Sequence, residues 1–183
     1  MNLPASVGAS ERARLFCGLR LPDRALDTLS EWQAEHIEQG RPVPRDHLHV
    51  TLAFLGHRPV VELESILGAL REAAAAAAPI GLVPERYREG RSVGMLVLRD
   101  LGGAATRLAE DLQGRLERLG VYEPERRPWL PHLTVVRFRE RPRLQPLLPD
   151  LGEVSPSDAA AYHSLLRSGG AQYVVVESFA LGG

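Results

Sequence analysis

Two short His-x-Thr segments, each in an apolar stretch and about half a chain apart, constrain this sequence more than any other feature. His49 and Thr51 lie in RPVPRDHLHVTLAFLG, and His132 and Thr134 lie in ERRPWLPHLTVVRF. Alternate side chains of a β-strand share one face, so each pair sets an imidazole and a hydroxyl on one side of a strand. Each segment follows a helical pattern and a proline-containing loop. This likeness predicts two similar lobes that face each other across a pseudo-twofold axis.

The paired segments supply the groups that phosphodiester cleavage needs without a metal ion. A base must activate the nucleophile, an acid must protonate the leaving oxygen, and donors must hold the non-bridging oxygens. Two histidines titrate near neutral pH and can serve as base and acid, while two threonine hydroxyls can donate. One His-x-Thr would mean little, but two copies favour a catalytic site. The pattern itself does not say which histidine is the acid.

The periodicity along the chain predicts an α+β fold. Helices are expected over residues 23–39, 60–78 and 101–119. Strands are expected over residues 12–21, 47–55, 80–87, 92–98, 132–139, 159–167 and 171–181. Residues 1–10 are small and polar and are expected to form a flexible tail, with residues 11–183 as a single bilobal domain.

Composition narrows the function. All 22 residues counted as Lys plus Arg are Arg, which excludes a Walker A lysine and a lysine-adenylating ligase. The formal charge of −1 argues against a protein that coats long duplexes, so contact with a nucleic acid should be local. The single cysteine, Cys17, is expected in the core. No targeting segment or membrane span is expected, so the predicted location is the cytoplasm.

The motifs HLHVTLAFLG and PHLTVVRF resemble the paired HxTx signatures of the 2H phosphoesterases, and of bacterial RNA 2',3'-cyclic phosphodiesterases (2'-5' RNA ligases) in particular. RLFCGLRLP resembles that family's opening strand, and LLRSGGAQYVVVESFAL its final hairpin. The resemblance implies two antiparallel sheets flanking a central cleft, with helices outside. It also implies hydrolysis of RNA 2',3'-cyclic phosphate ends to 2'-phosphate ends without a metal or other cofactor, and reversible 2'-5' joining without ATP.

By the same resemblance, His49 donates a proton to the leaving 3' oxygen, His132 activates water, and Thr51 and Thr134 bind the phosphate oxygens. The expected partners are RNA 3' ends or cyclic-phosphate nucleotides, with no membrane or protein partner and a monomeric state.

Three further residues are candidates for substrate binding. Arg137 could clamp the phosphate, although strict alternation from His132 puts it on the wrong face unless the strand bulges or ends there. Phe16 could stack on a base or pack in the core. Phe54 has the same phase problem as Arg137, so core packing is the preferred interpretation and base stacking the alternative. Five arginines flank the second motif and together could form a basic rim for RNA: Arg126, Arg127, Arg139, Arg141 and Arg143.

Several alternatives remain open at this point. His47 shares the face of His49, and the two could ligate a metal with His132 as the third ligand. His36, His57 and His163 are expected to be structural or surface residues. The same chemistry could act on an ADP-ribose cyclic phosphate or a 2'-5' oligonucleotide. A non-catalytic module that binds RNA ends is the rival from another class.

Overall fold

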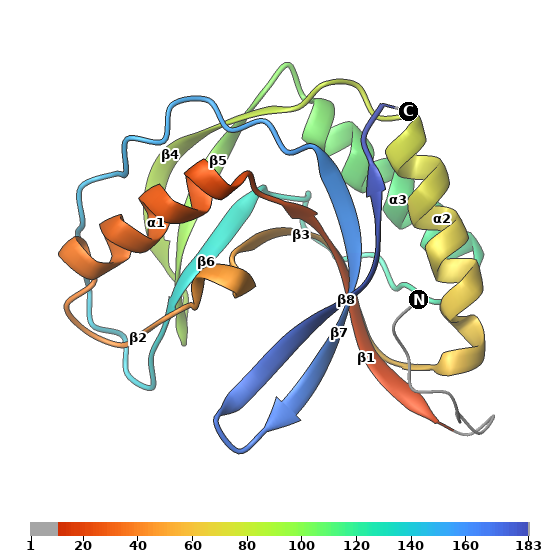
Figure 1. Ribbon diagram of the computed structural model, residues 1–183, viewed down its shortest axis with the longest axis horizontal. Coiled ribbons are helices and arrows are strands. Elements are labelled where there is room, and N and C mark those ends of the chain that lie inside the picture. The colour runs from red at the N-terminus through yellow and green to blue at the C-terminus, as the bar shows by residue number, and fades with distance from the viewer. Residues whose placement is uncertain (1–10, 183) are drawn as a thin grey trace.

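The computed structural model describes residues 11–182, which form a curled antiparallel β-sheet with three α-helices packed against it (Figure 1). The tail expected over residues 1–10 lies outside the described residues. The helices are α1 (Asp23–His36), α2 (Leu63–Ala75) and α3 (Ala104–Arg118). The strands are β1 (Arg12–Arg20), β2 (Arg41–Pro42), β3 (His49–Pro59), β4 (Gly81–Glu89), β5 (Val93–Leu101), β6 (His132–Arg137), β7 (Asp158–Arg167) and β8 (Gly170–Ala180). The predicted α+β class is confirmed.

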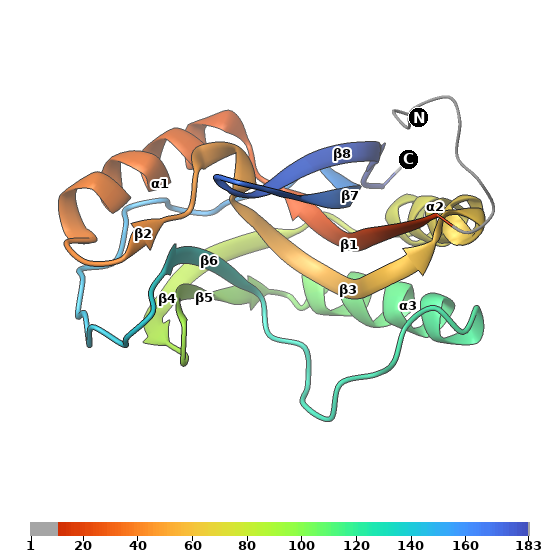
Figure 2. The ribbon, with the colours of Figure 1, turned by 90° about the horizontal axis from the view of Figure 1, so that it is seen from below.

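The strands of the described region join into one sheet rather than the two separate sheets expected. Their order is β4-β5-β6-β3-β1-β7-β8, with β2 added beside β6. Each half contributes one motif strand to the centre, and these two strands, β3 and β6, pair in register only at Val50 and Leu133. The sheet bends where β3 and β6 meet (Figure 2). The strands of the two halves therefore run in different directions, although the halves belong to one hydrogen-bonded sheet. The pseudo-twofold duplication stays a prediction.

Strand β1 shows why the sheet has two different faces. Leu15, Cys17 and Leu19 belong to the main core, whereas Phe16 belongs to a second, smaller cluster with Tyr162 of β7. This is the alternation that the sequence predicts, and it places Phe16 on the face opposite the core. Burial raises the pKa of the Cys17 thiol to about 12, in keeping with a core cysteine.

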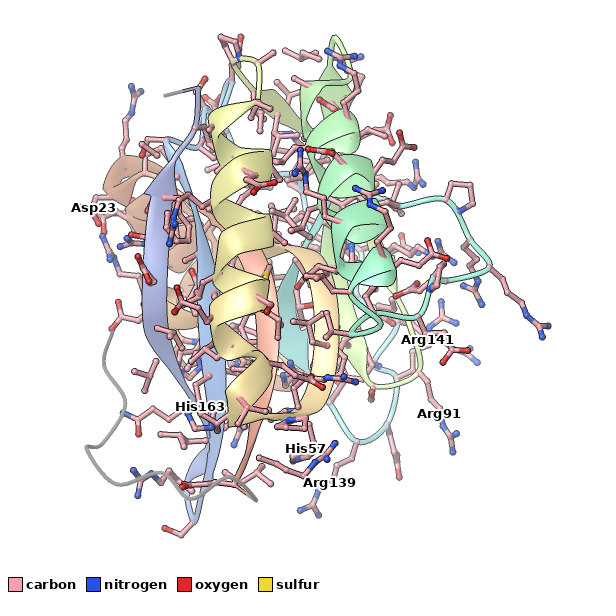
Figure 3. The ribbon with its side chains drawn as sticks, turned by 90° about the vertical axis from the view of Figure 1, so that its right-hand side faces the viewer. Asp23, His57, Arg91, Arg139, Arg141 and His163 are labelled. Atoms are coloured by element: carbon pink, nitrogen blue, oxygen red, sulfur yellow. The ribbon has the colours of Figure 1, made fainter. Side chains whose placement is uncertain are left out.

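The helices cover the apolar side of the sheet. In Figure 3, α2 and α3 lie side by side in front of the strands, and α2 contacts β7 and β8 while α3 contacts β3 and β5. Helix α1 lies against the other half, where the buried Trp32 donates a hydrogen bond to the carbonyl of Leu147 at 2.7 Å. None of the helices within residues 11–182 has the length and apolar character needed to cross a bilayer.

All three helices are shorter than predicted, and most strand ends differ from the prediction by a few residues, the first motif strand most of all. Helix α1 ends at His36, because the chain turns at Gly40, with φ of 95°, to enter β2. Helix α2 begins after a 3₁₀ turn over Val60–Glu62. Helix α3 begins only after Gly102 and Gly103, which both adopt positive φ. The first motif strand begins at His49 rather than His47. It ends at Pro59, whereas the prediction ended it before Gly56.

Candidate active site

The two motifs meet in one pocket on the face of the sheet opposite the main core. The pocket has a volume of about 330 Å³. His49, Thr51, His132 and Thr134 all line it, as do the three weaker candidates Phe16, Phe54 and Arg137. The remaining lining residues are Arg14, Arg41, Val43, His47, Ser164, Ala171 and Tyr173. Residues from both halves of the chain therefore converge on one cavity.

The two histidines are held in the same way. Nδ1 of His49 lies 2.7 Å from the carbonyl oxygen of His47, and Nδ1 of His132 lies 2.8 Å from that of Leu130. In each motif the imidazole thus contacts the backbone two residues earlier. A carbonyl oxygen can only accept, so Nδ1 carries the proton in both rings. The neutral imidazole then has its lone pair on Nε2, which is the nitrogen suited to proton transfer.

The first threonine contacts its histidine directly. Nε2 of His49 and the hydroxyl of Thr51 are 3.0 Å apart. Since Nε2 of the neutral ring is an acceptor, Thr51 donates this hydrogen bond. An incoming phosphate oxygen can replace Nε2 as the acceptor and leave the nitrogen free to react. Thr134 occupies the corresponding position after His132 and lines the same pocket.

His49 is held neutral in the free protein. Burial lowers its pKa to about 4, and the positive charges of His132 and Arg137 act in the same direction, while the hydrogen bond to the His47 carbonyl opposes the shift. The ring of Phe16 lies against the imidazole, with centroids 4.7 Å apart. Apolar contact of this kind disfavours the charged form of a histidine.

Phe16 supports His49 rather than presenting a surface to a base. It is 4% exposed and packs on Tyr162 with centroids 4.7 Å apart. Tyr173 approaches it edge-on at 5.0 Å. A side chain so covered has little ring surface left for stacking. The base-stacking role considered for Phe16 is therefore replaced by packing beneath the first histidine.

Arg137 reaches the pocket because β6 bulges. Gly94 and Met95 of β5 pair with Val136 and Thr134 respectively, so Val135 is the extra residue. The carbonyl of Val135 accepts from Nε2 of the buried Gln33 at 2.6 Å and from the backbone of Val43 at 2.9 Å. A bulge reverses the alternation beyond it, which is the condition that the sequence analysis set for Arg137.

Phe54 also reaches the pocket because its strand, β3, is bulged. The register with β1 shifts at Leu52 and again at Leu55. Helix α3 supports the first bulge, because Nε2 of Gln113 donates to the carbonyl of Leu52 at 2.7 Å. Phe54 is 47% exposed, and the guanidinium of Arg14 lies over its ring at 4.9 Å. The preferred interpretation of Phe54 as a core residue is thus wrong, because the bulge turns it towards the pocket.

A contact between the two motifs secures their relative position. Nε1 of Trp129, in the loop that precedes β6, donates to the carbonyl of Thr51 at 3.0 Å. The loop that leads into the second motif thus provides a hydrogen-bond donor for a carbonyl beside the bulge in β3. Trp129 lies in the second motif segment, and its role could not be predicted from the sequence.

The pocket carries a net positive charge that the two motifs alone do not reveal. Arg14, Arg41 and Arg137 line it, and among residues 11–182 no carboxylate does. Within residues 11–182, none of the three lies within ion-pair distance of an acidic side chain; Arg14 instead donates to Ser164 at 3.2 Å. Arg14 and Arg41 were missed as site residues because the strand pairings that bring them to the pocket, β1 with β3 and β2 with β6, cannot be seen in the sequence. The arrangement suits an anion.

His47 does not pair with His49 as strand alternation suggested. It lies in a 3₁₀ turn over Arg45–His47, and its ring stacks on Tyr173 with centroids 4.5 Å apart. Burial lowers its pKa, opposed by Asp46 and assisted by Arg137. In the part of the chain that the structure describes, no group of three or more His, Cys, Asp or Glu side chains is placed to hold a metal ion.

None of the five arginines that flank the second motif lines the pocket itself. Nε of Arg141 lies 3.2 Å from the buried carboxylate of Glu89, which also accepts from the backbone of Arg143. Arg139 and Arg141 are labelled in Figure 3 beyond β6. Arg139 lines a neighbouring hollow, which it shares with Arg41 and Arg137. A basic rim formed by these five arginines stays a prediction.

Comparison with known proteins identifies the family. A family model described as the 2'-5' RNA ligase superfamily matches residues 21–163. The RNA 2',3'-cyclic phosphodiesterase of Thermus thermophilus is 33% identical, with 93% of this chain and 91% of the relative covered. The Escherichia coli protein of the same name is 34% identical over 70% of this chain and 73% of its own length.

Solved structures agree with these relatives. TT0787 of Thermus thermophilus superposes with a TM-score of 0.79 at 32% identity, covering 93% of this chain and 98% of that one. Escherichia coli LigT complexed with 3'-AMP gives a TM-score of 0.77 at 25% identity, covering 94% of this chain and all of LigT. The resemblance drawn from the two motifs is confirmed, and with it the enzyme class: the chain belongs to the 2'-5' RNA ligase superfamily of 2H phosphoesterases.

Proposed function

We propose that this protein hydrolyses RNA 2',3'-cyclic phosphate ends to 2'-phosphate ends without a metal ion. The observation that carries the proposal is the matched pair of histidines in one positively charged pocket. Each has Nδ1 fixed on a backbone carbonyl and Nε2 available for proton transfer. Two relatives named RNA 2',3'-cyclic phosphodiesterase, at 33% and 34% identity, support the choice of substrate.

The site residues take complementary roles in this reaction. His132 accepts a proton from water, whose oxygen attacks phosphorus, and the bond from phosphorus to the 3' oxygen breaks. His49 donates its proton to that leaving oxygen, so the phosphate remains on the 2' oxygen. Thr51, Thr134 and Arg137 donate to the non-bridging oxygens as negative charge develops. Attack by the 5'-hydroxyl of a second RNA in place of water would give a 2'-5' linkage, with no ATP required.

For His49 to act as the proton donor, the bound substrate must raise its low pKa. The empty pocket holds His49 neutral, whereas a proton donor must be charged. A bound cyclic phosphate brings a negative charge beside the imidazole, and an opposite charge within about 4–6 Å favours the charged form. Substrate binding therefore charges His49 as the reaction is about to begin.

Phe54 offers the place for the terminal base. It is the half-exposed aromatic ring of the pocket, and Arg14 already lies against it. Stacking of a base on an aromatic side chain is tolerant of sequence. Structures of the related LigT include complexes with 3'-AMP, NADP+ and ATP. These complexes support a nucleotide as the ligand of this pocket. A cyclic phosphate of ADP-ribose or a 2'-5' oligonucleotide remains the second substrate class to test.

The test is turnover of an RNA oligonucleotide that ends in a 2',3'-cyclic phosphate, with EDTA present. Wild type should produce a 2'-phosphate end, and His49→Ala and His132→Ala should each lose the activity by a factor of about 100 or more. His57→Ala is the matched control, because His57 lies on the same strand as His49, is exposed and does not line the pocket.

Three other results would change the proposal. Loss of activity in EDTA with recovery on adding a divalent metal would show a metal enzyme. Binding without conversion would indicate a module for RNA ends. Turnover confined to ADP-ribose cyclic phosphate or 2'-5' oligonucleotides would keep the chemistry and replace the substrate.

A further inference from the structure

The end of the pocket away from Phe54 contains two arginines side by side. Arg41 of β2 and Arg137 of β6 are directly opposite each other in the antiparallel register. Side chains so placed lie on the same face of a sheet, and like charges in this position destabilise the pair. Within residues 11–182 neither guanidinium has a carboxylate within ion-pair distance, so the repulsion is not offset by an acid.

Arg41 lies where the pocket of the two motifs meets neighbouring hollows. It lines the pocket of the two motifs and also an adjoining hollow of about 180 Å³. That hollow includes Arg137, His47 and Tyr173 but none of the four motif residues. At the other end, Phe54 lines a separate hollow that shares no residue with the one at Arg41. The site therefore extends in two directions from its centre.

Two glycines lie close to Arg41, one before it in the chain and one beside its guanidinium. Gly170, at the start of β8, has φ of 119°, and a Cβ there would lie 3.0 Å from Nη2 of Arg41. Gly40 has φ of 95°, and its Cβ would lie 2.9 Å from the carbonyl oxygen of Arg137. A side chain at Gly40 would push β2 away from β6, and one at Gly170 would require the guanidinium of Arg41 to move.

The scissile group does not need this second arginine. A cyclic phosphate diester carries one negative charge, and the proposed mechanism already gives it Arg137, two threonines and a protonated histidine. The next anion along an RNA chain is the phosphate on the 5' side of the terminal nucleotide. Phe54 and Arg41 line separate hollows on either side of the motif residues, so a nucleotide with its cyclic phosphate at the motifs and its base at Phe54 has its 5' phosphate available to Arg41.

We infer that Arg41, beside Arg137, binds the phosphate on the 5' side of the terminal nucleotide and so selects RNA ends over nucleosides that carry only a cyclic phosphate. The inference rests on the proposed function for its substrate. An arginine fork pairs with two phosphate oxygens, and the bound anion offsets the repulsion between the two guanidinium groups.

The experiment compares two substrates, adenosine 2',3'-cyclic phosphate and its 5'-phosphorylated form. Wild type should show a higher kcat/KM for the 5'-phosphorylated substrate, by a factor of about 10 to 100 for a hydrogen bond to a charged group. Arg41→Gln should bring this ratio close to one. Arg41→Lys should give an intermediate ratio, since it keeps the charge and loses the planar fork.

Two control variants separate this role from a general effect of charge. Arg14→Gln removes a positive charge from the opposite end of the same pocket and should leave the ratio of the two substrates near the wild-type value. Arg118→Gln changes an exposed arginine at the end of α3, remote from the pocket residues, and should alter neither rate. An equal fall of the ratio in Arg14→Gln, or an equal loss on both substrates in Arg41→Gln, would overturn the inference.

A binding measurement keeps the inference testable if the proposed reaction fails. Calorimetry with adenosine 5'-monophosphate and adenosine requires no turnover. Wild type should prefer the monophosphate, and Arg41→Gln should lose that preference without a lower melting temperature, because the substitution removes a repulsive pair. Equal affinity of wild type for the two compounds would reject the subsite, whereas absence of hydrolysis with the preference intact would reject only the proposed function.

Discussion

The imidazole of His49 rests on the ring of Phe16, with centroids 4.7 Å apart and planes 29° from parallel. Phe16 is itself buried against Tyr162, so the first catalytic candidate stands on an aromatic cluster of β1 and β7. This contact contributes to the burial that lowers the pKa of His49 to about 4. A residue of β1, which belongs to neither motif, thereby helps to keep His49 neutral.

The pKa of His49 should change when an anion enters the pocket. In the free protein we expect His49 to titrate near pH 4, and with inorganic phosphate or adenosine 2'-monophosphate bound we expect a higher value, because the anion stabilises the imidazolium. NMR titration of the histidine ring protons measures both values, with His49→Gln used to assign the signal. A free value at or above 6.5, or no rise on binding, would contradict the proposed charging of His49 by substrate.

Stability should fall in acid partly through the same residue. A histidine has a pKa near 6.5 in the unfolded chain, so between pH 6.5 and 4 the unfolded state binds more protons at this site than the folded state. Its contribution is present above pH 6.5 and is lost as the pH falls towards 4, by about 3 kcal/mol in all. Urea unfolding at several pH values should show a shallower loss for His49→Gln than for wild type. Parallel curves for the two proteins would disprove this link.

Gly18 should be required for the position of His49. It pairs with Thr51 across β1 and β3, and a Cβ at Gly18 would lie 3.1 Å from Cδ2 of His49. We expect Gly18→Ala to displace the imidazole and to lower kcat by about tenfold or more, since small misplacements of reacting groups are costly. Gly68→Ala is the control, because a Cβ there meets nothing within 4 Å. Full activity of Gly18→Ala would show that the ring adjusts without consequence.

Phe54 should contribute to substrate affinity more than to folding. Because it is 47% exposed, Phe54→Ala should change the melting temperature little. Loss of one base-stacking contact should raise KM for the cyclic-phosphate oligonucleotide by about tenfold, from a stacking energy of about 1–3 kcal/mol. Val61→Ala removes another exposed apolar side chain that does not line the pocket and should leave KM unchanged. An unaltered KM in Phe54→Ala would place the base elsewhere.

Local patterns in the sequence were sufficient to predict the two motifs, the class of fold and the core position of Cys17. Alternation along a strand is a local property, so it correctly set His49 with Thr51 and His132 with Thr134, and it correctly separated Phe16 from Cys17. The doubled motif was enough to identify the family. These features depend on residues close together in the chain, and they required no knowledge of what each strand would pair with.

Only the tertiary structure decided the positions that depend on neighbouring elements. The bulges that turn Phe54 and Arg137 towards the pocket are held by Gln113 and Gln33, from helices far away in sequence. Arg41 joins the site because β2 pairs with β6. The low pKa of His49 likewise arises from burial against other strands. Local sequence specifies which face a side chain takes in a regular strand, but the hydrogen bonds that interrupt the strand, and the solvent lost around a side chain, exist only once the chain has folded.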